Sequence, residues 1–107
     1  MFARKVSIRL KKDARAEFTK TFEQQIMPVL QKQKGFKDEL VLSVAGGHDV
    51  LAISLWESQA DAEAYDTAEY KNVLKMVEPL IEGTPRVGTP EILHTTLYQA
   101  LTAVSAA

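Results

Sequence analysis

The chain contains no cysteine among its 107 residues. Disulfides, thiolate nucleophiles and zinc or iron–sulfur sites built on cysteine are therefore excluded. Histidine is almost as scarce, with His48 and His94 as its two instances. They are far apart in the sequence and form no His-x-His or H-E-x-x-H group. The chain also lacks a P-loop and a G-x-G-x-x-G motif. We therefore expect no metal site and no cofactor.

Neither an excess of one charge nor a long apolar run is present. Thirteen basic and fourteen acidic side chains give a net charge of −1, so no basic stripe favours nucleic acid. No apolar run approaches the ~20 residues that span a bilayer, and the N-terminus lacks the apolar stretch of a signal peptide. We expect a cytoplasmic protein that binds neither nucleic acid nor membrane.

The composition that remains is that of an ordinary globular domain. Hydrophobic residues make up 46% of the chain and charged residues 25%. The length suits one domain, residues 1–107, with a core over about 2–98 and a C-terminal tail over 99–107.

The first half of the chain predicts a strand followed by a helix. Apolar and polar residues alternate over 2–10, the pattern of a half-buried strand. Helical spacing over 14–34 gives one apolar stripe and predicts a helix with Asp13 as its N-cap. Pro28 lacks an amide donor and should kink or divide this helix. The stripe consists of Phe18, Phe22, Ile26, Val29 and Leu30.

A hairpin is predicted next, with strands over 36–45 and 50–56. Gly46-Gly47 tolerates the positive φ angles that tight turns require. The second of these strands is apolar on both faces, which is typical of a central strand covered on both sides.

The last third of the chain predicts a second helix and a fourth strand. Ser58 and Asp61 form an S-x-x-D start signal, while Pro79 and the segment 83–85 should end the helix. Residues 86–98 are predicted as the last strand. The resulting order, βαββαβ, is the ferredoxin-like α+β arrangement, an antiparallel four-stranded sheet with two helices on one face.

The other face of that sheet needs a cover. The apolar row Leu51, Ile53 and Leu55 would be buried there against a second copy of the chain. We therefore expect a homodimer in which two sheets pack face to face as a barrel.

Trp56 is the strongest candidate for a catalytic residue, with Tyr65 and His94 as the other two, and it marks the expected ligand site. It shares a strand face with Ala52 and Ser54, whose small side chains leave room for a flat organic molecule. Tyr65, about two turns into the next helix, could line the same space. The alternative is that Trp56 is a core residue whose indole N–H is bonded locally.

Other side chains are weaker candidates. His94 is either an acid–base group facing the pocket or a hydrogen-bonded strand residue, and His48 is either a base or an exposed turn residue. Arg4 either faces a carboxylate or phenolate or extends to the surface. Val6 and Phe22 complete the expected substrate-binding residues. Asp38 and Glu39 are adjacent in a strand and point to opposite faces, so they form no carboxylate pair.

These features together resemble the antibiotic biosynthesis monooxygenase family of dimeric α+β barrels. The resemblance lies in Gly35-Phe36, the hairpin, Trp56-Glu57-Ser58 and the segment 65–70. The family includes cofactor-independent oxygenases of aromatic phenols, quinol oxygenases, haem-degrading oxygenases and proteins with no assigned activity. In the cofactor-independent members, the deprotonated substrate itself reduces O2.

The chain departs from two branches of that family. The haem-degrading branch uses a helix histidine that the segment 70–74 lacks, and an asparagine where this chain has Val6. The polyketide-oxidising branch places an asparagine at the position of Ala52. In this chain the polar group that would orient a phenolic substrate or its peroxide is therefore missing, or it is supplied by Ser54, Tyr65 or His94.

The resemblance implies a homodimer that binds a hydrophobic, aromatic small molecule beside Trp56. The favoured activity is a cofactor-independent monooxygenase acting on an aromatic or quinol-type substrate. Two alternatives remain: a non-catalytic, stress-associated or ligand-binding module, and a non-oxidative enzyme of the isomerase or decarboxylase kind that uses His94 or Tyr65 as acid–base.

Overall fold

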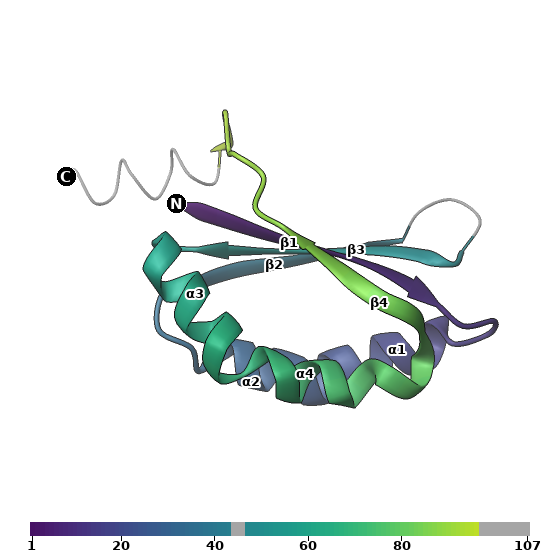
Figure 1. Cartoon of the computed structure of the whole chain (residues 1–107). Coiled ribbons are helices and arrows are strands. Elements are labelled where there is room, and N and C mark those ends of the chain that lie inside the picture. The colour runs from purple at the N-terminus through teal and green to yellow at the C-terminus, as the bar shows by residue number, and fades with distance from the viewer. Residues whose placement is uncertain (44–46, 97–107) are drawn as a thin grey trace.

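In residues 1–43 and 47–96, which the computed structural model describes, four antiparallel strands form one sheet with helices on one face (Figure 1). The strand order is β2-β3-β1-β4. This confirms the predicted ferredoxin-like fold, including the central position of β3. The strands are β1 Phe2–Leu10, β2 Phe36–Ser43, β3 Asp49–Trp56 and β4 Ile81–Gly88.

The first helical segment is divided, as Pro28 predicts. It comprises α1 (Arg15–Thr21), the π-helix η1 (Phe22–Ile26) and α2 (Met27–Gln31), with Pro28 in the first turn of α2. Proline has no amide hydrogen to donate to the preceding turn. The π-helical turn of η1, which is wider than an α-helical turn, lies directly before α2. The prediction of Asp13 as N-cap was wrong. Ala14 takes that position, no side chain caps the helix, and Asp13 has φ of 60°.

The second helical segment begins as predicted and runs through α3 (Gln59–Ala68), α4 (Tyr70–Val77) and the short 3-10 helix η2 (Glu78–Leu80). The Ser58 hydroxyl accepts a hydrogen bond from the Asp61 amide at 3.2 Å. Gly35 has a φ of 79° and lies against the Asp61 side chain, which a Cβ at residue 35 would overlap. A glycine is therefore needed where the chain leaves α2 and starts β2.

The two faces of the sheet differ in what covers them. On β3, Val50, Ala52, Ser54 and Trp56 are buried beneath the helices, whereas Leu51, Ile53 and Leu55 lie on the opposite face. The register pairs Leu40 with Ile53 and Leu42 with Leu51, so both β2 leucines share that opposite face. Leu40 is 54% exposed and Leu42 is 42% exposed. We call these five residues the open sheet face.

The fourth strand was misplaced in the prediction for residues 86–98. It is β4, Ile81–Gly88, which follows η2 directly and pairs only with β1. An edge strand can contain Pro85, because a proline there need not donate a ladder hydrogen bond. The pairing of β4 with β1 is also irregular at this point, between Ser7 and Arg9 of β1. His94 consequently lies beyond the strand.

Parts of three predictions lie outside the described residues: the end of strand two at 44–45, the turn residue Gly46, and the segment 97–107 with Tyr98 and the tail. None of the described helices is long and apolar enough to cross a membrane.

Candidate functional site: a carboxyl group in an apolar pocket

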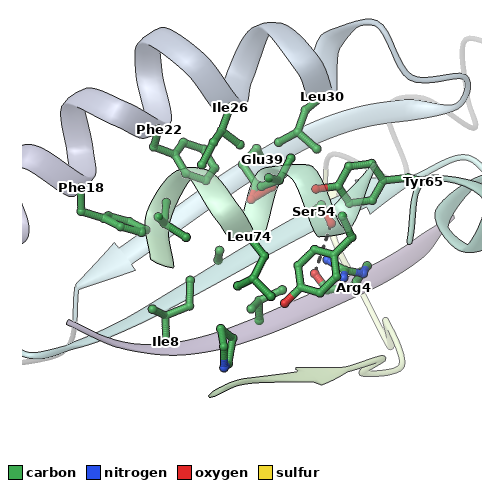
Figure 2. A pocket seen from close by; sticks show the side chains of 16 residues that line it. Arg4, Ile8, Phe18, Phe22, Ile26, Leu30, Glu39, Ser54, Tyr65 and Leu74 are labelled. Atoms are coloured by element: carbon green, nitrogen blue, oxygen red, sulfur yellow. Dashed lines mark hydrogen bonds between the residues drawn. The ribbon is translucent and has the colours of Figure 1, made fainter. Parts of the chain in front are cut away.

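A pocket lies between the covered face of the sheet and the helices (Figure 2). The space between its side chains is about 520 Å³ including the open side, but only about 50 Å³ is wide enough for the centre of a water molecule. Its wall is mostly apolar. The lining residues that carry polar groups are Arg4, Glu39, Ser54, Tyr65 and Tyr70; the apolar ones are Val6, Ile8, Phe18, Phe22, Ile26, Leu30, Ala52, Val73, Leu74, Val77 and Pro85.

The π-helix shapes the helical wall. Phe22 and Ile26 are the first and last residues of η1, and both line the pocket. Single-turn π-helices insert an extra residue into a helix and occur often at functional sites. Figure 2 shows Phe18, Phe22, Ile26 and Leu30 along this wall, across from Glu39.

Glu39 is the most unusual group in the pocket. It pairs with Ser54 across β2 and β3, which places its side chain on the covered face. Its Oε2 is buried and has no hydrogen-bond partner among the described residues. Burial raises the pKa of this carboxyl to about 8, against a smaller lowering by Arg4 and a further rise from Asp38. A carboxyl with this pKa can hold or release a proton near neutral pH.

Arg4 supplies a positive charge to the same space. The residue is 5% exposed, and one Nη donates to the Asp66 carboxylate at 2.7 Å. Its guanidinium carbon lies 4.2 Å from the ring centroid of Tyr70 and 5.4 Å from that of Tyr65. Asp66 uses only part of the guanidinium fork, so the group retains donors for an anion.

The two tyrosines are proton donors rather than bases. Burial raises the pKa of both Tyr65 and Tyr70 above the ordinary value of 10.0, although Arg4 lowers each in part. Both hydroxyls therefore stay protonated at neutral pH. In Figure 2 the Tyr65 hydroxyl and the Glu39 carboxyl point toward the same space.

Trp56 lies behind the pocket rather than in its wall. It is 0% exposed, is absent from the lining and stacks on Tyr65 with ring centroids 5.2 Å apart. Its Nε1 donates to the Ser54 hydroxyl at 2.8 Å, and that hydroxyl donates to the Arg4 carbonyl at 3.3 Å. Trp56 thus positions Tyr65 and Ser54 from the far side.

The structure brings most of the predicted site residues together. Arg4, Val6, Phe22, Ala52, Ser54 and Tyr65 all line the pocket. His94 does not line it and is exposed beyond β4. His48 is at the hairpin end of the sheet, where its carbonyl accepts from the Leu10 amide.

Sequence reasoning missed Glu39 and Tyr70 as site residues. Strand alternation contains the signal for Glu39, because Glu39 and Val41 share the face opposite to Leu40 and Leu42. That glutamate was considered only as a partner for Asp38. Tyr70 could not be assigned, because its place depends on how α4 follows α3 at Glu69.

Within residues 1–43 and 47–96, no three histidine, aspartate or glutamate side chains are grouped so that they could hold a metal ion.

The chain is similar in sequence and in structure to known proteins. The sequence profile described as "Antibiotic biosynthesis monooxygenase" matches residues 1–74. No curated protein sequence matches the chain.

Solved structures share its fold at low sequence identity. A Nitrosomonas europaea protein proposed to be an antibiotic biosynthesis monooxygenase is 17% identical, with a TM-score of 0.71 over 88% of this chain and 100% of that one. SnoaB from Streptomyces nogalater, a cofactor-independent oxygenase, is 15% identical, with a TM-score of 0.72 over 89% and 95%. NE2512 of N. europaea, a protein of unknown function, is 16% identical, with a TM-score of 0.74 over 89% and 91%.

Proposed function

Because the chain belongs to the antibiotic biosynthesis monooxygenase family, we propose that it binds an aromatic small molecule in the pocket and oxygenates it without a cofactor. One observation carries the proposal: the Glu39 carboxyl has a pKa of about 8, and its Oε2 is buried without a hydrogen-bond partner among the described residues. A group that titrates near neutral pH inside an apolar pocket is suited to general base catalysis. SnoaB, whose fold is similar, is a cofactor-independent oxygenase, which motivates the oxygen-dependent form of the chemistry.

The substrate class is a phenol with an activated methylene group. Glu39 removes a proton from that methylene, and the resulting anion is delocalised onto the phenol oxygen. Arg4 and the tyrosine hydroxyls stabilise the negative charge in a pocket of low polarity. The apolar wall excludes water from the anion.

Oxygen then reacts with the anion directly. The anion gives one electron to O2, and the substrate radical and superoxide combine into a carbon-bound peroxide. This peroxide takes back the proton that Glu39 removed and becomes a hydroperoxide. Loss of the second methylene proton breaks the O–O bond, so that the carbon becomes a carbonyl and the outer oxygen leaves as hydroxide, which is protonated to water. In sum, CH2 and O2 become C=O and H2O, with the substrate as the only reductant.

The proposed assembly is a homodimer through the open sheet face. The face is supported as an interface by its exposed leucines on β2 and by the apolar row on β3 beside them. Contiguous apolar surface of this kind marks an association site on a small protein. Pairing two such faces would close the barrel that the family resemblance implies.

A ligand-binding protein without catalysis is the second candidate. It is favoured by the apolar lining, which suits an aromatic molecule whether or not Glu39 acts as a base. An enzyme that only moves a proton, such as an isomerase, would use the same Glu39 carboxyl without oxygen.

Oxygen uptake distinguishes these candidates. Purified protein, without added metal or flavin, is tested with a panel of hydroquinones and polycyclic phenols that carry an activated methylene. We expect substrate-dependent uptake of one O2 per carbonyl formed. Glu39→Gln should reduce the rate at least about a hundredfold, the lower range for loss of a general base. Glu63→Gln, which neutralises an exposed carboxylate on α3, is the matched control and should retain the rate.

The outcomes separate the proposals. Uptake that is unaffected by Glu39→Gln would reject Glu39 as the base. Ligand binding without uptake across the panel would favour the binding protein. Exchange of the methylene protons with solvent, without uptake, would favour a proton-transfer enzyme.

A further inference from the structure

A second hollow adjoins the pocket and runs between α1–η1 and the edge strand β2. Its volume is about 290 Å³. Phe18, Phe22 and Glu39 line both this groove and the pocket, so the two spaces meet at the Glu39 carboxyl. Figure 2 shows these three side chains gathered between helix and sheet.

The pocket alone is too small for the proposed substrate. An apolar cavity that holds benzene has a volume of about 150 Å³, whereas the pocket offers about 50 Å³. Sites for drug-sized ligands lie at roughly 300–1,000 Å³, a range that this pocket reaches only together with the groove. A ring whose reacting carbon contacts Glu39 must therefore extend toward the groove.

The far end of the groove is positively charged. Arg15 lines it together with Ser43, four residues along β2 from Glu39. The Arg15 guanidinium lies beside Gly47, 3.0 Å from where a Cβ would stand. Among the described residues, Arg15 forms no ion pair, whereas Arg4 and Arg9 do. Its charge is thus free to meet an anion.

The other charges of the groove set where an anion can bind. Glu23 and Glu39 also line it. Glu23 lies two helical turns from Arg15, so a negative ligand group is favoured at the Arg15 end and disfavoured at the other. The walls between the two ends include Phe18, Phe22 and Val41, which suit an apolar linker.

We propose that the substrate is elongated, with an aromatic ring at Glu39 and an anionic group, such as a carboxylate, at Arg15. Four residues of β-strand separate the two ends by roughly 13 Å, which sets the distance between the phenol and the anion. The inference rests on the proposed function and adds the length and charge of the substrate to it.

Calorimetric binding of a graded ligand series tests this inference. The probes are para-hydroxyphenyl alkanoic acids of increasing chain length, the primary alcohols of the same lengths and untailed para-alkylphenols. We expect affinity for the acids to peak at the chain length that spans the groove. At that length the acid should bind about two- to fivefold more tightly than the alcohol, the contribution of an exposed ion pair.

Two variants assign the effect to Arg15. Arg15→Gln should abolish the preference for acid over alcohol and leave the binding of untailed phenols unchanged. Lys20→Gln removes the same charge from the same helix but from outside the groove, and should keep the preference.

Equal affinity of acids and alcohols at every length, or a preference that survives Arg15→Gln, would overturn the inference. The untailed phenols separate this failure from failure of the proposed function. If the untailed phenols bind and Glu39→Gln alters their binding, only the proposed anionic group of the substrate at Arg15 is refuted. If the untailed phenols do not bind, the aromatic pocket is refuted as well.

Discussion

Most copies of Glu39 carry a proton at pH 7, because burial raises the pKa of this carboxyl to about 8. The protonated form avoids the cost of a charge in an apolar wall. Arg4 limits the rise without cancelling it, since its own charge is partly engaged by Asp66. The residue is therefore poised between an acid and a base, and a reaction that needs the carboxylate should accelerate as pH rises toward 8.

The same pKa predicts how stability depends on pH. The folded carboxyl titrates at about 8 and the unfolded one near 4.5, so between these values the folded state holds a proton that the unfolded state has lost. The free energy of unfolding should fall as pH rises through this window, by about 1.4 kcal/mol per pH unit and on the order of 5 kcal/mol in total. Below pH 4.5 the contribution is constant.

Denaturant unfolding of the wild type and of Glu39→Gln between pH 5 and pH 8 measures this contribution. The difference between the two curves isolates Glu39, because other groups titrate alike in both. We expect the variant to gain stability relative to the wild type as pH rises. Parallel curves across this range would contradict a raised pKa.

At the scale of elements, the sequence predicts what depends on local chemistry. Strand β1, the division of the helix near Pro28 and the Ser58 cap follow from alternation, a missing amide and a hydroxyl at the right position. Asp13 failed as a cap because its backbone has a positive φ and lies one residue too early. A local pattern cannot reveal such an offset.

Elements that depend on distant partners were harder to predict. The limits of β4 are set by pairing with β1, and an edge position admits a proline that would be excluded elsewhere. His94 was predicted as a site residue because the fourth strand was expected over 86–98, whereas β4 ends at Gly88. Glu39 was overlooked because its burial depends on Phe22 and other helical residues that are far away in sequence.

At the scale of the whole molecule, the two faces of the sheet have separate roles. The covered face holds the pocket, and the open sheet face is proposed to hold a second copy. The apolar residues on both faces of β3 predicted that each face is covered, and the structure shows the helices over the face that bears Ala52 and Ser54. The pocket itself could not be predicted, since its volume depends on how closely the helices pack over the small residues Ala52 and Ser54.

Ile53→Lys tests the proposed dimer. A lysine in the middle of the open sheet face would place a charge in an apolar interface, so the dimer should dissociate at micromolar concentration. Sedimentation velocity measures the change in mass, and circular dichroism checks that the monomer stays folded. Gln25→Lys adds the same charge on the exposed side of η1 and should remain dimeric. A wild type that sediments as a monomer would contradict the assembly.

The proposed chemistry requires that Glu39 is a titratable base within the pocket. Carboxyl-carbon NMR of selectively labelled protein follows its titration directly, with Glu39→Gln to identify the signal. We expect a midpoint near pH 8, well above the ordinary value of 4.5. A midpoint near 4.5 would show a solvated carboxylate, and would remove the observation on which the proposed chemistry rests.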